Sequence, residues 1–233
     1  KAESEDVSLS DLYMTVVSKL DQQTKLMDMQ LAYGVQKVNA EDFTAKDIAI
    51  EFEINNLSGE FIEAYQTHSQ ELMNSSSAMM TEQLTEFLTN NLLSLVAANP
   101  EVNLTSLRGT LPEGSFNSHV HTSLAGVTAL PAQLADPSFW LQHTLIDANV
   151  KGDKAVIEWL ATAILKLQLA QDPMAQDMSE EEISELASQQ VPAMLAMFTQ
   201  QGFITTTDTD YSSTLTLKDK ALMLNSQPIP LPL

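Results

Sequence analysis

The chain has 233 residues, of which 31 are Asp or Glu and 11 are Lys or Arg, so its net charge is −20. This charge repels phosphate backbones and leaves no basic stripe to follow them, which argues against nucleic acid as a partner. A hydrophobic content of 44% can supply the core of one large or two small domains. The absence of cysteine excludes disulfides, thiolate zinc sites and thiol nucleophiles, and leaves the cellular compartment open.

We expect residues 1–25 to form a helical segment or a linker ahead of one α+β domain at 26–233. The first residues, KAESEDVSLS, show neither the basic start nor the apolar stretch of a signal peptide. Residues 92–98 form the longest nearly apolar stretch, which is far shorter than the roughly 20 residues that cross a bilayer. We therefore expect a processed chain or a fragment without a membrane span.

Two adjacent stretches show the two-residue period of half-buried strands. The apolar positions of the first stretch are Met27, Met29, Leu31, Tyr33 and Val35, and those of the second are Ile48, Ile50, Phe52 and Ile54. The residues between them are mostly polar, as expected when one sheet face is packed and the other is solvated. The two strands are expected to pair through residues 39–46.

Two helices are predicted after these strands. Ser58 is the expected N-cap of the first, and the helical stripe consists of Phe61, Ile62, Tyr65 and His68. The second helix carries Leu84, Leu88, Leu92 and Leu95 on one face and ends near Pro100. Both helices are expected to cover the apolar face of the sheet.

The chain then repeats the order of strands followed by helix. Strands are predicted at about 102–110, around Phe116, Val120 and Leu124, and at 139–150. Asp153 is the expected N-cap of a third helix, whose inner stripe is Val156, Leu160, Ala163, Ile164 and Leu167. The repeat suggests sub-units at 26–98 and 99–233 within the domain.

A fourth helix and a hairpin complete the prediction. Ser179 and Glu182 form a capping box, Pro192 is expected to kink or divide the helix, and Gly202 is placed to end it. A turn at Asp219 and Lys220 would pair Leu217 with Leu222 and Leu215 with Leu224, which places four leucines on one buried face. The expected fold is α+β, with antiparallel strands in meander order forming one or two curved sheets and amphipathic helices packed on one face.

Several of these segments resemble the YdgA-like bacterial family of uncharacterised envelope proteins (domain of unknown function 945). The resemblance rests on GFITTTDTDYSSTLTLKDKALMLNSQPI near the C-terminus, NPEVNLTSLRGTLPEG, INNLSGEFIEAY and ANVKGDKAVIEWL. In the family pattern glycines occupy the positions of Lys220 and Ser226. Because lysine adopts positive φ reluctantly, we expect a wider or bulged turn here.

The resemblance implies an inner-membrane anchor followed by a long periplasmic region in Gram-negative bacteria. We accordingly expect this chain to be the C-terminal portion, located in the periplasm and tethered to the inner membrane in the full-length protein. Membrane contact is expected only through an anchor that this chain does not contain. The family pattern itself records strands, caps and turns, and names no activity.

The sequence offers only weak candidates for chemistry. His119 and His121 would share one face of a strand and could bind a metal, although solvated histidines are the simpler interpretation. Asp208 and Asp210 form an Asp-x-Asp pair that calcium sites often contain, but turn residues explain it better. His68 is expected to be a satisfied core histidine and His143 to face the sheet. No cofactor is expected.

Three functions are compatible with these observations. The favoured one is a non-enzymatic envelope protein that binds a partner protein or an apolar or lipid ligand, with an acyl chain held in a leucine- and methionine-lined cleft between sheet and helices. The second is a purely structural periplasmic module with a fully packed core. The third is a hydrolase whose site assembles from distant residues, since the sequence contains no catalytic motif.

Overall fold

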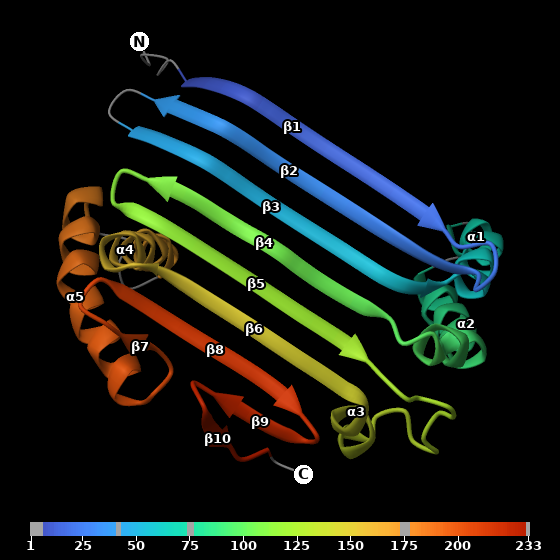
Figure 1. Ribbon diagram of the computed structural model, residues 1–233. Helices are drawn as coiled ribbons and strands as arrows, with labels where there is room; N and C mark the ends of the chain where they lie inside the picture. The colour runs from blue at the N-terminus through green and yellow to red at the C-terminus, as the bar shows by residue number, and fades with distance from the viewer. Residues whose placement is uncertain (1–6, 41–42, 74–76, 173–177, 232–233) are drawn as a thin grey trace.

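The computed structural model describes residues 7–40, 43–73, 77–172 and 178–231, and its centre is one open antiparallel sheet (Figure 1). The strands are β1 (Val7–Leu20), β2 (Leu26–Ala40), β3 (Phe43–Ser58), β4 (Glu101–Leu111), β5 (Gly114–Leu124), β6 (Thr144–Asp153), β7 (Thr205–Thr206), β8 (Asp210–Lys218), β9 (Ala221–Leu224) and β10 (Gln227–Ile229). The helices are α1 (Gly59–Met73), α2 (Ser77–Ala97), α3 (Pro137–His143), α4 (Lys154–Gln171) and α5 (Glu180–Gln200). The α+β class and the meander order are confirmed.

The strand order β1-β2-β3-β4-β5-β6-β8-β9-β10 follows the chain, with β7 paired beside β8. One helical hairpin, α1 with α2, follows the third strand, and another, α4 with α5, follows the sixth. Neighbouring strands are antiparallel, so β3 and β6 run in opposite directions and their C-terminal ends lie at opposite ends of the sheet along the strand direction. The two helical hairpins therefore stand at opposite ends of the strands (Figure 1).

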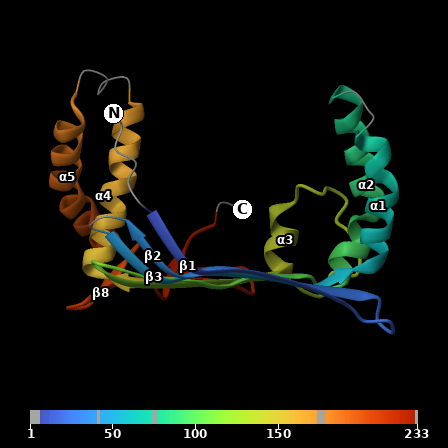
Figure 2. The same ribbon diagram turned by 90° about the horizontal axis from the view of Figure 1, so that it is seen from above.

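Both helical hairpins rise from the same face of the sheet (Figure 2), which we call the helix-side face. A Cβ atom added to Gly152 of β6 would contact Ile157 of α4 and Phe116 of β5, which fixes these residues on that face. The strand register extends this face through the pairs Val120–Ala148, Leu104–Val120, Phe52–Leu104 and Leu31–Phe52. The predicted apolar stripes of β2 and β3 thus lie on the helix-side face.

The helices cover only the two ends of the helix-side face, in contrast to the expected full coverage. Val156, in the first turn of α4, is fully buried, and Phe87 of α2 is buried beside α1. Midway along β2 and β3, the helix-side residues Tyr33 and Phe52 are 40% and 37% exposed. A broad apolar strip across the middle of the sheet consequently remains open.

The expectation that residues 1–25 form a helix or a linker is wrong, because residues 7–20 form β1, which pairs along its length with β2. An irregularity at Asp11 obscured the alternation of this strand in the sequence. Asp11 has a positive φ of 53° and lies unpaired in the register, so the apolar positions change from odd (Val7, Leu9) to even (Leu12, Met14). The sheet is therefore continuous from Val7, and the domain begins earlier than expected.

The strand expected at 139–150 is also partly wrong, because residues 137–143 form α3 and β6 begins at Thr144. Asp136 caps this short helix, since its Oδ1 accepts a hydrogen bond from Ser138 N at 3.0 Å. Pro137 occupies the first turn, where its missing N–H costs nothing. This Asp-Pro start signal went unused in the sequence prediction.

Of the three predicted N-caps, Ser58 and Ser179 cap their helices and Asp153 does not. Ser58 Oγ accepts a bond from Phe61 N at 3.2 Å, and Ser179 and Glu182 form the expected capping box. The backbone N–H and then the hydroxyl of Ser179 lower the pKa of Glu182. Asp153 stands at the N-cap position of α4, but its Oδ2 accepts a bond from Ser115 N at 2.7 Å instead of capping the helix.

The end of the chain agrees with the predicted hairpin register, with Leu217 opposite Leu222 and Leu215 opposite Leu224. The wider turn that we expected is wrong: Asp219 and Lys220 form a two-residue turn with φ of 51° and 64°. A two-residue turn with positive φ at both positions matches the strand twist, which compensates for placing lysine there. Leu217 is buried at 4% exposure, whereas the other three leucines are half-buried.

Candidate ligand-binding site

The helical hairpin of α4 and α5 forms an apolar hollow. Val156 anchors the first turn of α4 to the sheet, and the buried residues of α5 are Ile183, Ala187, Val191 and Leu195. Pro192 lies within α5 without dividing it, in contrast to one of the two expected outcomes. The first turns of α4 rest on the sheet, and its later turns stand clear of it beside α5 (Figure 2).

A groove of about 810 Å³ runs along this hairpin. Its lining consists of Trp159, Thr162, Ala163, Lys166, Leu167, Ala170, Met178, Glu180, Ile183 and Ser184. The α4 members recur every three to four residues, so they form one stripe of the helix. From Trp159 to Ala170 this stripe rises about 16 Å, and the groove volume lies within the usual range for small-molecule sites.

Two residues of the predicted inner stripe of α4 lie at the surface. Ile164 is 55% exposed and Leu167 is 65% exposed, although both were expected to be buried. The reason is that α4 projects from the sheet after its first turns, so only Val156 is buried among its residues. Leu167 lines the groove, and Ile164 does not.

Trp159 connects the groove to the open sheet. Its ring stacks on Phe43 of β3, with centroids 6.2 Å apart and planes inclined by 19°. Phe43 lies near the start of β3, where that strand approaches α4 (Figure 1). The apolar surface is therefore continuous from the helix-side face into the foot of the groove.

Two charged side chains, Lys166 from α4 and Glu180 from the first turn of α5, line the groove. In the part of the chain that the structure describes, the ammonium of Lys166 has neither an ion pair nor a hydrogen bond. An ammonium beside an apolar groove can pair with an anionic head group while the groove holds the attached chain. The carboxylate of Glu180 would repel such an anion.

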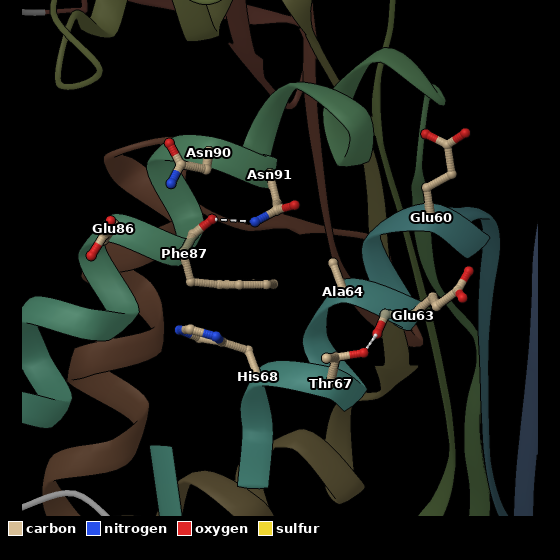
Figure 3. Close-up of a pocket in the computed structure, with 9 residues that line it drawn as sticks. All are labelled: Glu60, Glu63, Ala64, Thr67, His68, Glu86, Phe87, Asn90 and Asn91. Carbon is tan, nitrogen blue, oxygen red and sulfur yellow. Dashed lines mark hydrogen bonds between the residues drawn. The ribbon is translucent and has the colours of Figure 1, made fainter. Parts of the chain in front are cut away.

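A second pocket, of about 570 Å³, lies between α1 and α2 (Figure 3). Phe87 is buried at its centre, and the ring of His68 stacks on Phe87 at 5.5 Å with an angle of 18°. His68 thus packs against an apolar ring, as expected for a core histidine, although its side chain is only half-buried.

The polar groups of this second pocket mostly serve the helices themselves. Thr67 Oγ1 donates to the carbonyl of Glu63 at 2.9 Å, and Asn91 Nδ2 donates to the carbonyl of Phe87 at 2.8 Å (Figure 3). The carboxylates of Glu60 and Glu63 lie on the opposite side of the pocket from that of Glu86 (Figure 3). The three acids therefore do not converge on one point where an acid and a base could act together.

The structure places His119 and His121 on one sheet face, as predicted, but their rings have different partners. His119 Nε2 lies 3.3 Å from Asp147 Oδ1, and His121 Nδ1 lies 2.6 Å from Asn103 Oδ1. The described residues contain no cluster of three or more His, Asp or Glu side chains arranged to hold a metal ion. This polar face lies across the sheet from the groove.

Of the remaining candidates, Asp208 is exposed, whereas Asp210 and His143 contact neighbouring protein groups. Asp210 Oδ2 accepts bonds from Thr207 and Thr209 at 3.2 and 3.0 Å and pairs with Lys151 at 3.3 Å; the Thr209 hydroxyl contributes most to the lowered pKa of this carboxyl. Asp210 of the Asp-x-Asp segment therefore stabilises the turn at residues 207–210. His143, which was expected to face the sheet from a strand, ends α3, and its Nδ1 lies 2.7 Å from the carbonyl oxygen of Ala125.

The sheet, the two helical hairpins and the groove define an open-faced α+β protein with an exposed apolar surface. A model of bacterial proteins of unknown function, DUF945, matches residues 1–232, and the chain belongs to this family. No curated protein and no solved structure matches the chain. None of the helices in the described ranges has the length and hydropathy that a bilayer crossing requires.

The sequence prediction did not identify the groove, although it placed Ala163 and Leu167 on an apolar stripe. It expected an apolar cleft between the sheet and the helices, whereas the groove lies between two helices. One signal was available, because Trp159, Ala163, Leu167 and Ala170 form an apolar stripe in addition to the buried position Val156. When the apolar stripe of a helix extends beyond the part that packs on the sheet, the remaining apolar side chains are expected to contact a second partner.

Proposed function

We propose that this protein is a non-enzymatic binding protein of the bacterial envelope that holds a single acyl chain in the groove between α4 and α5. The groove of about 810 Å³, lined mainly by apolar side chains and bordered by Lys166, carries this proposal. A carboxylate or another anionic head group would pair with the Lys166 ammonium, and the chain would lie along Leu167 and Ala163 towards Trp159.

The envelope location is supported by the family resemblance and by the type of ligand. In the resembled family, an inner-membrane anchor keeps the periplasmic region close to lipids. The net charge of −20 opposes adsorption of the protein surface to anionic head groups. Capture of a chain would then depend on the groove and on the tether.

The first test is a fluorescence titration with a dansyl-labelled fatty acid. Leu167→Asp should weaken binding by at least about tenfold, because the introduced carboxylate is unfavourable against an apolar chain. Ile164→Asp is the matched control, since Ile164 lies on the same helix, is similarly exposed and does not line the groove. Equal losses in the two variants, or no saturable binding to the wild type, would contradict the proposal.

The head-group contact is tested in the same titration. Lys166→Gln should weaken binding of the fatty acid by roughly threefold to tenfold and leave binding of its methyl ester unchanged. Glu180→Gln should slightly strengthen binding of the acid, because it removes the opposing charge. No saturable binding of either probe would favour the alternative function, a structural module of the envelope.

A further inference from the structure

Strand β1 forms an open edge of the sheet (Figure 1). It has 14 residues, all of them exposed, and β2 is its only neighbour in the described strand order. Its outward N–H and C=O groups have no partner strand there, and its side chains include Leu12, Met14 and Val16 on the helix-side face. A long exposed apolar edge of this kind is a template for pairing with another strand.

The sequence of β1 is complementary to itself when it is read antiparallel. Its only charged residues are Asp11 and Lys19, which lie four residues on either side of Thr15. An antiparallel pairing centred on Thr15 therefore places Asp11 of each strand opposite Lys19 of the other. The same register places Met14 opposite Val16 and Tyr13 opposite Val17, so like faces meet.

Other registers that keep the two faces aligned lose this match. A shift that centres the pairing on Val16 brings Asp11 opposite Asp21, which is a repulsive pair. A shift that centres it on Met14 places Asp11 opposite Val17 and leaves both charges without a partner. A shift of the pairing register by a single residue would place the apolar side chains of one copy on the same sheet face as the polar side chains of the other.

We propose that β1 pairs with β1 of a second copy of this chain, antiparallel and centred on Thr15. The two copies are then related by a two-fold axis, which is the symmetry of a closed homodimer. This axis is perpendicular to the sheet, because the strands are antiparallel and the same faces are aligned. The sheet becomes continuous through both copies, and the two helix-side faces join into one apolar surface. This pairing does not depend on the proposed ligand, because β1 and the groove share no residues.

The absence of cysteine permits a direct test of the register. Thr15→Cys places two thiols opposite each other on the axis, and a short thiol-specific cross-linker should join most of the protein into covalent dimers. Gln190→Cys, on the exposed side of α5, is the control and should remain monomeric on denaturing gels. The reaction is run at 0.15 M salt, where repulsion between the acidic copies is screened beyond about 8 Å.

Charge reversal tests the same contact without cross-linking. Asp11→Lys or Lys19→Asp should raise the dimer dissociation constant in sedimentation equilibrium by about tenfold, since each change affects two symmetry-related pairs. The double reversal should restore it. Lysine at position 11 is compatible with the positive φ there, because Lys25 and Lys220 adopt φ of 58° and 64° in this chain.

Circular dichroism establishes that each variant is folded. A wild-type protein that stays monomeric at several hundred micromolar, or equal cross-linking of the Thr15→Cys and Gln190→Cys proteins, would overturn the proposal and leave the edge to a strand of different sequence. Failure of the double reversal to restore the dimer would also overturn it, because the register would then be wrong.

Discussion

Val156→Asp is expected to destabilise the protein by at least about 3–5 kcal/mol, which is a large part of the stability of a typical domain. Val156 is fully buried where the first turn of α4 meets the sheet. A carboxylate at this position would lose its hydration, because the side chain of residue 156 has no access to solvent. Urea denaturation followed by circular dichroism measures the change.

The matched control for this variant is Ala155→Asp, one residue earlier in the same turn of α4. Ala155 is exposed, and a negative charge near a helix N-terminus interacts favourably with the helix dipole. We expect the control to be neutral or slightly stabilising. A similar loss in both variants would mean that the first turn of α4 does not pack on the sheet as described.

Leu217→Ala is expected to cost about 2–5 kcal/mol, because it leaves a cavity at the most buried position of the C-terminal hairpin. Leu217 pairs with Leu222 on one side and with Ile146 of β6 on the other, so its side chain packs between two strands. Thermal and urea unfolding of the purified variant measure the loss.

The neighbouring substitution Thr216→Ala provides the control, since Thr216 lies on the polar face of the same strand and pairs with Met223. It should change stability by less than about 1 kcal/mol. A loss below roughly half a kcal/mol for Leu217→Ala would show that the hairpin is peripheral to the fold.

Strand pairing was predictable wherever side-chain alternation was uninterrupted. The stripes of β2 and β3 and the β8–β9 register follow from a period of two residues, because one sheet face is apolar and the other polar. The pattern failed at β1, where the irregularity at Asp11 moves the apolar positions from odd to even. A positive φ at a single aspartate is a tertiary feature that alternation alone does not reveal.

The groove was not predictable, because it depends on how far α4 projects from the sheet. Amphipathicity identified Leu167 and Ile164 as apolar positions, but it assigned both to the core. The structure separates them, since Leu167 lines the groove and Ile164 lies outside it. The sequence pattern indicates which residues are apolar, and only the packing of α5 decides which of them share a surface.

Photo-cross-linking with a fatty acid that carries a diazirine near the end of its chain tests the central claim most directly. If the chain lies in the groove between α4 and α5, mass mapping should place the label on α4 and α5, near Trp159 and Ala163. Unlabelled fatty acid should compete for this labelling, and Leu167→Asp should abolish it while Ile164→Asp does not. Labelling spread over the open sheet or over α1 and α2, or labelling that unlabelled fatty acid does not reduce, would contradict the account.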